Sequence, residues 1–162
     1  MSGSATSTTP AVTPNRAGLR DGQVSEFTVI VPVKEGGAAK LRAILAAQGG
    51  RFALADKVGS VHDMRFVLLD GDTKLLFATT YDGDWESYIN DFATLIPEAL
   101  DLLFSEAQGW PGIRSPQVKD YIVKYQITAS AWYVAYPEAT VAKIRRGQRI
   151  TAAVDGLLDA AS

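Results

Sequence analysis

The chain has 162 residues, with 16 Lys and Arg against 18 Asp and Glu, and its formal net charge is −2. It contains no cysteine, which excludes disulfides, thiolate metal sites and cysteine nucleophiles and suits a reducing compartment. The slightly acidic net charge argues against nucleic-acid binding, which needs a basic surface. The length of the chain suits one domain with its own core.

The first 24 residues are rich in Ser, Thr, Pro and Gly. We expect residues 1–24 to form a disordered tail, followed by a single domain over residues 25–162. The tail has no basic start followed by an apolar run, so it does not resemble a secretory signal. No stretch of about 18 successive apolar residues occurs, and we therefore expect a cytoplasmic protein without a membrane span.

The first regular elements are a strand and a helix. Residues 27–34 (FTVIVPVK) are apolar on both faces, which predicts a strand that is covered on two sides. The glycine pair at 36–37 ends this strand. Apolar residues at helical spacing then predict a helix over residues 38–48, which the glycine pair at 49–50 ends. Residues 51–60 are interpreted as a loop or a short irregular strand.

Residues 61–81 (VHDMRFVLLDGDTKLLFATTY) predict a β-hairpin whose turn lies within residues 70–72. Because side chains alternate between the two faces of a strand, one face is expected to carry His62, Met64, Phe66, Leu68, Leu75, Phe77, Thr79 and Tyr81. The other face is expected to carry Asp63, Arg65, Val67, Leu69, Lys74, Leu76, Ala78 and Thr80. The assignment is the same whether the two turn residues are 70–71 or 71–72.

A long helix follows the hairpin. Asp84 is a good N-cap for a helix that starts at Trp85, because its carboxylate can accept from the first free backbone N–H groups. Pro97 should kink this helix or divide it in two. Residues 109–112 (GWPG) close it.

The last part of the chain predicts a short helix, a strand and a final helix. Ser115 followed by Pro116 is typical of a helix start, and we expect that helix to run to about Gln126. Residues 130–136 (SAWYVAY) are apolar on both faces and predict the last strand. Thr140 should cap the final helix. The basic residues of this helix lie off its apolar stripe, which favours a solvated face over a phosphate or lipid site. They are Lys143, Arg145, Arg146 and Arg149.

The order of these elements predicts an α+β fold of the ferredoxin-like β-α-β-β-α-β type, with an extra short helix and a C-terminal helix. Such a sheet has helices on one side only. Residues 27–34 and 130–136 are nevertheless apolar on both faces, so the open face needs a cover. We expect a second copy to supply it, sheet against sheet, in a homodimeric α+β barrel. The C-terminal helix could instead cover part of that face.

This element order and the two-faced strands resemble the dimeric α+β-barrel superfamily. The superfamily includes cofactor-independent antibiotic-biosynthesis monooxygenases, chlorite dismutases and dye-decolourising peroxidases. The segments LLFATTYDGDWESYINDF and GWPGIRSP also resemble an uncharacterised group of small bacterial proteins. The resemblance covers roughly residues 26–138 at the level of architecture, and no catalytic motif matches residue by residue. In haem-binding members a helix supplies the axial histidine, whereas His62 lies on a predicted strand.

His62 is the only histidine of the chain, and histidine is the residue type that exchanges a proton near neutral pH. It is therefore the first candidate for acid–base catalysis. Tyr81 lies on the facing strand, close enough for a polar pair. His62 could equally be hydrogen-bonded or solvated at a strand end without a role, and its expected neighbours place it at the rim of the helix-packed core.

Asp63 and Arg65 are expected on the opposite face, where a barrel cavity would lie. Two opposite charges on a mainly apolar face cost free energy unless they are paired or used. Asp63 could act as a base, and Arg65 could hold an anionic or enolate oxygen. The alternative is an ordinary ion pair at a strand end or across a dimer interface.

Aromatic residues supply the candidate pocket walls. The corner of residues 81–85 carries two carboxylates beside Tyr81 and Trp85, but it is too short for a full set of metal ligands, so no metal is expected. Trp132 lies in an aromatic C-terminal half that suits either a small-molecule pocket or plain packing. Tyr81, Trp85 and Trp132 are the substrate-binding candidates.

These observations lead to two hypotheses. The first is an enzyme that abstracts a proton from a hydrophobic small molecule without a cofactor, for oxygenation, isomerisation or cyclisation, with Asp63, Arg65 and His62 as catalytic residues. The second is a non-catalytic binding or accessory subunit of a larger redox enzyme. Haem binding is a weaker alternative. The sequence names neither the substrate nor the reaction.

Overall fold

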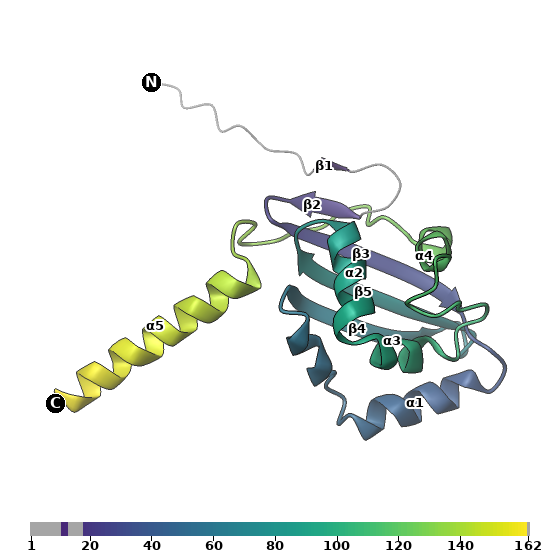
Figure 1. Cartoon of the computed structure of the whole chain (residues 1–162), viewed down its shortest axis with the longest axis horizontal. Coiled ribbons are helices and arrows are strands. Elements are labelled where there is room, and N and C mark those ends of the chain that lie inside the picture. Colours follow the sequence, from purple (N-terminus) through teal and green to yellow (C-terminus); the bar gives the residue numbers. More distant parts are fainter. Residues whose placement is uncertain (1–10, 13–17, 162) are drawn as a thin grey trace.

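The computed structural model describes residues 11–12 and 18–161 and shows an α+β fold around one antiparallel sheet (Figure 1). The strands are β1 (Ala11–Val12), β2 (Leu19–Asp21), β3 (Val24–Pro32), β4 (Val61–Leu69) and β5 (Lys74–Asp82). The helices are α1 (Gly37–Ala47), a 3₁₀ helix (Ala53–Lys57), α2 (Trp85–Leu95), α3 (Pro97–Phe104), α4 (Val118–Tyr125) and α5 (Val141–Ala160). The sheet order is β1-β2-β3-β5-β4. Because β5 lies between β3 and β4, the arrangement is compatible with the predicted ferredoxin-like fold.

The strand predicted at residues 130–136 is wrong, because residues 127–140 belong to no strand or helix. The edge of β3 that this strand would use is already occupied. β2 pairs with the first residues of β3, and Gln126 forms a bridge to Val29 farther along. The Ile127 N–H also donates to the carbonyl of Thr28 at 2.9 Å. Residues 130–136 therefore cannot take the place beside β3 that the prediction gave them.

The prediction of a disordered tail over residues 1–24 is wrong for residues 19–24. Residues 19–21 form β2, and Val24 begins β3 after a tight turn at Gly22. The Leu19 N–H donates to the carboxylate of Glu26, across the turn, at 2.8 Å, a contact that the low hydrophobicity of the segment does not reveal. The rest of the predicted tail, apart from residues 11–12, lies outside the described residues.

The hydrophobic core lies between one face of the sheet and helices α1–α4. Alternate residues of β3 and β5 face this core and contact the buried side chains of the four helices. The strand residues are Phe27, Val29, Val31, Leu75, Phe77 and Tyr81. α2 ends at Leu95 and α3 begins at Pro97, which confirms that the proline divides the helix, since it lacks the N–H of a continuous helix. The predicted faces of the hairpin hold over residues 63–69 and 74–81, and His62 is the exception.

The helix starts follow local capping. Asp84 accepts from the Ser87 N–H at 2.8 Å, and Thr140 accepts from the Lys143 N–H at 3.2 Å, so both predicted caps are confirmed. α4 begins at Val118, two residues later than Pro116, where the sequence predicted the first helical position. Residues 114–117 form turns instead, and the Ser115 hydroxyl accepts from the Gln117 N–H.

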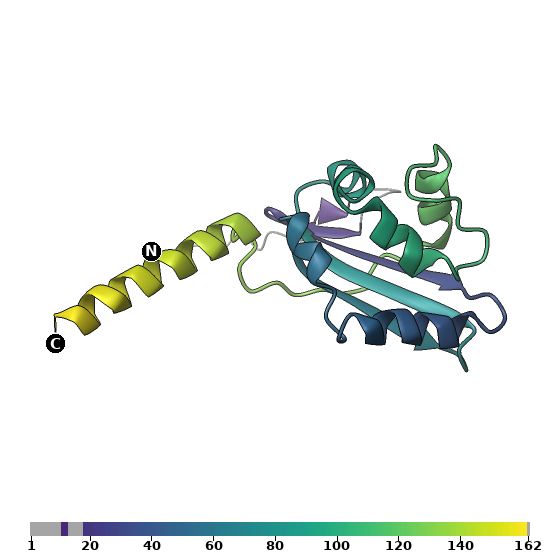
Figure 2. The ribbon, with the colours of Figure 1, turned by 60° about the horizontal axis from the view of Figure 1, so that its bottom comes forward.

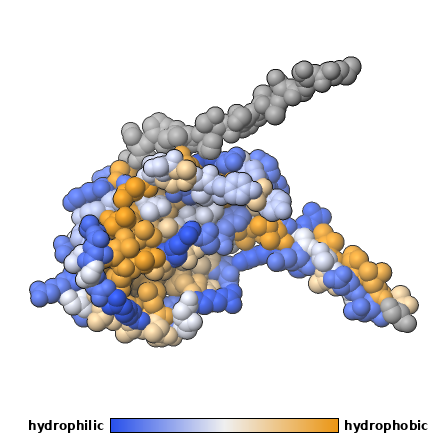
Figure 3. Space-filling view, turned by 180° about the vertical axis from the view of Figure 1, so that it is seen from behind, coloured by the Kyte–Doolittle hydropathy of each residue, from blue (hydrophilic) through white to orange (hydrophobic). Residues whose placement is uncertain are grey.

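Within the described part of the chain, no helix packs on the opposite face of the sheet. The segment that joins α4 to α5 passes on this side (Figure 2) and lies over the end of the sheet near Val24 and Thr80. Apolar residues remain at the surface farther along, and Figure 3 shows them as a hydrophobic band. Val67 is 41% exposed there, beside the half-buried Ile30 and Leu76. We call this surface the bare sheet face.

We predict that Asp84→Ala lowers the free energy of unfolding by about 1 kcal/mol, the usual effect of losing an N-cap. Hydrogen bonds from the Ser87 N–H and hydroxyl hold the pKa of Asp84 below its ordinary value. The carboxylate therefore stabilises the fold above the pKa of the unfolded chain, and this contribution disappears as pH falls through the lower, folded pKa. Urea unfolding of both proteins from pH 7 to pH 2.5 measures the difference. A difference that grows toward low pH would contradict the prediction.

Candidate functional site

A cleft of about 430 Å³ lies between the bare sheet face and the segment before α5. One wall is formed by the ends of β3, β4 and β5, and the other by residues 132–139 and the first turn of α5. Its lining combines charged, polar and aromatic side chains, in this set: Val24, His62, Asp63, Arg65, Thr80, Trp132, Tyr133, Val134, Ala135, Tyr136, Ala139 and Ile144. The cleft therefore brings together four of the six predicted site residues, namely His62, Asp63, Arg65 and Trp132.

His62 reaches this cleft because of a β-bulge. Val61 is paired with Tyr81 and Asp63 with Thr80, so His62 is an extra residue on β4 with no partner of its own in the ladder. Val61 consequently packs against the core, while His62 lies with Asp63 on the other face. The prediction that His62 shares the face of Tyr81 is wrong, because the alternation on which it depended breaks at the bulge.

His62 is held in place by a carboxylate at the end of β5. Its Nε2 lies 2.7 Å from Asp82 Oδ1, and both side chains are largely buried, with 19% and 15% of their surface exposed. The other oxygen of Asp82 accepts from the Val141 N–H at 2.8 Å, at the first residue of α5. Because Asp82 accepts at Nε2, the neutral ring carries its proton there and presents Nδ1 as the basic nitrogen. The engaged Nε2 does not fit the role of an axial haem ligand.

Asp63 and Arg65 form an ion pair across 3.1 Å on the cleft side of β4. Their side chains are 51% and 63% exposed, so water still solvates both charges. The large cost of burying charge that the sequence suggested does not arise here, and an exposed pair of this kind contributes about 0–1 kcal/mol. What the pair does provide is a guanidinium group at the mouth of a cleft that also contains a histidine.

The aromatic wall comes from the irregular segment. Trp132 is half-buried, while Tyr133 and Tyr136 are 85% and 76% exposed. Large exposed rings beside a cleft are suited to covering a flat apolar ligand while their polar groups stay in water. The segment also receives support from β3 and the turn before it, because the Gln23 N–H donates to the carbonyl of Pro137 at 2.8 Å.

Tyr81 and Trp85 lie on the other side of the sheet and do not line the cleft. They are 0% and 2% exposed within the core, and the ring of Tyr81 stacks on that of Tyr88 with centroids 3.9 Å apart. Burial raises the pKa of both tyrosines above the ordinary value. The expectation that they share a pocket with Trp132 is corrected, because Tyr81 faces the core and α2 packs Trp85 against Phe27.

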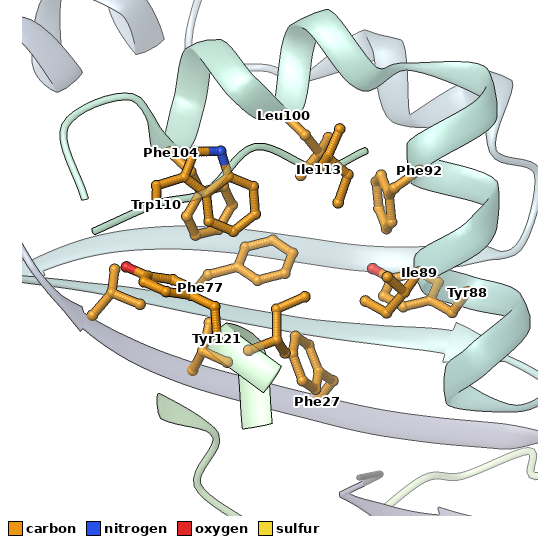
Figure 4. Close-up of a pocket in the computed structure, with 13 residues that line it drawn as sticks. Phe27, Phe77, Tyr88, Ile89, Phe92, Leu100, Phe104, Trp110, Ile113 and Tyr121 are labelled. Carbon is orange, nitrogen blue, oxygen red and sulfur yellow. The ribbon is translucent and has the colours of Figure 1, made fainter. Parts of the chain in front are cut away.

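A second cavity lies inside the core (Figure 4). Figure 4 shows Phe104 and Trp110 on one side of it and Phe77 on a strand below. Its volume is about 30 Å³ and its exposed lining is apolar, so it offers space of about one water molecule and no group for acid–base chemistry. Burial raises the pKa of Tyr121, at its edge, to about 12, and the Tyr121 hydroxyl donates to the carbonyl of Gln108. The cleft, not this cavity, is the candidate site.

Sequence reasoning missed Asp82 as the partner of His62, and it placed Thr80 on the face of Asp63 without naming it as a site residue. A signal for both existed. Side chains alternate along β5, so Asp82 and Thr80 share the face of Asp63 once Tyr81 is assigned to the core. The bulge that brings His62 to the same face has no comparable signal in the residues around it.

Comparisons with protein-family models, with curated proteins and with solved structures found no match for this chain. Within residues 11–12 and 18–161, no group of three His, Asp or Glu side chains could hold a metal ion. The helices of this part of the chain are also too short or too polar to cross a membrane. The interpretation of the cleft therefore depends on its own geometry.

Glu26 attaches the cleft wall to the sheet, which gives a testable prediction. This carboxylate is 5% exposed and accepts from the N–H groups of Leu19 at 2.8 Å and Ala129 at 3.4 Å. Glu26→Ala leaves both N–H groups without this acceptor, and we expect the free energy of unfolding to fall by about 2 kcal/mol. Urea unfolding measures the loss, and limited proteolysis should cut residues 127–140 faster. Stability equal to that of the exposed control Glu35→Ala would contradict the role of Glu26.

Proposed function

We propose that the protein is an enzyme that abstracts a proton from a hydrophobic, oxygenated small molecule in the cleft, without a cofactor. One observation carries the proposal: a histidine oriented by a largely buried carboxylate borders a cleft that also contains a guanidinium group and aromatic walls. A base, an anion-holding group and an apolar surface are the elements that proton abstraction next to a carbonyl requires.

In the proposed step, Nδ1 of His62 accepts a proton from the carbon beside a substrate carbonyl. The electron pair of the broken C–H bond moves into the carbonyl, and Arg65 holds the resulting enolate oxygen. Asp82 stabilises the imidazolium that forms, and Asp63 orients Arg65 through their ion pair. Return of the proton to another carbon completes an isomerisation. Attack of the enolate carbon on an electrophilic carbon of the same molecule gives cyclisation, and reaction with dioxygen as co-substrate gives oxygenation.

The size and lining of the cleft support a small, flat, largely apolar substrate. Its volume of about 430 Å³ lies in the range of small-molecule sites. Trp132 and Tyr133 offer ring faces, while the charged lining groups lie on β4 and Asp82 holds His62 from the end of β5. A substrate with one oxygenated end and one aromatic or aliphatic end would place the oxygen near Arg65 and the rest along the irregular segment.

Deuterium exchange tests the proposal without knowledge of the natural substrate. A panel of hydrophobic ketones is incubated with the protein in D₂O, and NMR follows deuterium incorporation beside the carbonyl. We expect acceleration by the wild type, a loss of about 100-fold or more in His62→Gln, and a comparable loss in Arg65→Ala. Asp63→Ala should lose less, because it removes only an exposed ion-pair partner.

The matched control is Asp120→Asn, which changes an exposed carboxylate on α4 and should leave the exchange rate unchanged. Exchange that is undiminished in both His62→Gln and Arg65→Ala would remove these residues from the mechanism. Because His62 is the only histidine, its imidazole signals in ¹⁵N NMR independently report whether the proton lies on Nε2.

The second candidate function is that of a non-catalytic binding or accessory subunit of a larger redox enzyme. The exposed α5 and the exposed rings of Tyr133 and Tyr136 favour it, because such surfaces often belong to protein contacts. The exchange experiment separates the two functions. An accessory subunit would accelerate exchange on no ketone of the panel.

We also propose that two copies pack their bare sheet faces together in the expected α+β barrel. The support is the apolar band of β3, β4 and β5, with Val67 at its most exposed point. The segment of residues 132–139 lies over one end of the face, so a second copy would cover the part that it leaves open.

Val67→Glu tests this packing, because it places a charge in the proposed contact. The test uses a Val154→Glu background, in which the exposed face of α5 carries a charge and cannot hold two copies together. In this background we expect Val67→Glu to halve the molar mass measured by light scattering at micromolar concentration. The control is Ala46→Glu on the exposed side of α1, which should leave the mass of the background unchanged. An unchanged mass in Val67→Glu as well would exclude the sheet-to-sheet contact.

A further inference from the structure

The C-terminal helix α5 extends away from the rest of the molecule (Figures 1 and 2). Val141 is the one buried residue among its 20, and it lies at the first position of the helix. Contacts at the base of α5 include those of Val141 with Asp82, of Lys143 with the carbonyl of Glu138, and of Arg145 with Asp56 at 3.2 Å. Most of the helix is therefore presented to solvent.

The composition of α5 is that of a helix that needs packing to be stable. Gly147 and Gly156 lie in its interior, where glycine weakens a helix relative to alanine, and Ile150, Thr151 and Val154 are β-branched. Helices of this kind obtain most of their stability from burying an apolar face. Such a face exists, since Ile150, Val154 and Leu157 follow one another at spacings of four and three and are 52%, 48% and 72% exposed.

The charges of α5 indicate what covers this face. Its first half carries four basic residues and no acidic one, whereas its second half carries two acidic residues and no basic one: Lys143, Arg145, Arg146 and Arg149, then Asp155 and Asp159. A parallel pair of these helices would place four basic residues beside four others. An antiparallel pair places each basic half beside an acidic half and also opposes the two helix dipoles favourably.

We propose that α5 pairs antiparallel with α5 of a second copy of this chain. The seam consists of Gly147, Ile150, Val154 and Leu157, which occupy alternating a and d positions of a heptad pattern. With the two-fold axis beside residue 152, Ile150 lies opposite the partner's Val154. Leu157 then lies opposite the partner's Gly147, so the largest side chain of the seam meets the position with no side chain.

This pairing also bears on the cleft, although it does not depend on the proposed chemistry. The Val141 N–H is bound to the carboxylate that orients His62, and Ile144 lines the cleft. When a partner fixes α5 along its length, the Val141 N–H and the Ile144 side chain stay in place. A helix that frays in solvent loosens them.

Cysteine cross-linking tests the orientation, and the chain suits it because it has no native cysteine. In the proposed register Thr151 lies beside the partner's Thr151, so we expect Thr151→Cys to form a disulfide-linked dimer under mild oxidation. Gly147→Cys alone and Leu157→Cys alone should not, because their equivalent positions are roughly 15 Å apart along the helix axis. A mixture of these two variants should cross-link. Cross-linking of Gly147→Cys alone as fast as Thr151→Cys would overturn the antiparallel arrangement.

Molar mass tests the partner in the full chain, with Val67→Glu as the background so that the sheet contact is absent. In this background we expect a dimer, and we expect Val154→Glu to reduce it to a monomer. Ala152→Glu, on the opposite side of α5, should leave the dimer unchanged. Circular dichroism checks that both variants keep their folded core. A monomer in the Val67→Glu background, including one that binds anionic phosphatidylserine vesicles through α5, would overturn the proposal.

Discussion

The outer edge of β3 is shared by two segments, and the course of the whole C-terminal part follows from this sharing. β2 pairs with the first residues of the strand, and Gln126 and Ile127 bond to its middle. Glu26 joins the two segments by accepting from Leu19 and Ala129. With that edge filled, residues 127–140 pass on the bare side of the sheet. They form one wall of the cleft and begin α5 away from the core.

A single extra residue in β4 brings His62 into that cleft. The bulge moves His62 from the core side to the solvent side, next to the end of β5. Asp82 then binds the imidazole with one oxygen and the first N–H of α5 with the other. One carboxylate therefore connects β4, β5 and α5, and the orientation of the candidate base is coupled to the position of the terminal helix.

The core cavity and the cleft have different physical characters. The core cavity is small and apolar, and the hydroxyls near it are already engaged, that of Tyr88 with Thr79 and that of Tyr121 with Gln108. The cleft is larger, open to water and lined by charged groups that remain partly solvated. Proton transfer needs a group that can change its charge at modest cost, and the partly solvated cleft provides that condition.

The sequence by itself determined the elements that depend on neighbouring residues. An apolar run predicted β3, and strand-like runs on either side of a turn signal predicted the hairpin. Asp84 and Thr140 predicted the helix starts, and Pro97 predicted the division between α2 and α3. Only the tertiary structure decided that residues 19–21 and 126–127 take the edge expected for residues 130–136. It also decided that His62 meets Asp63, Arg65 and Trp132, while Tyr81 and Trp85 enter the core. The reason is that strand pairing and bulges result from competition between distant segments, which no local pattern records.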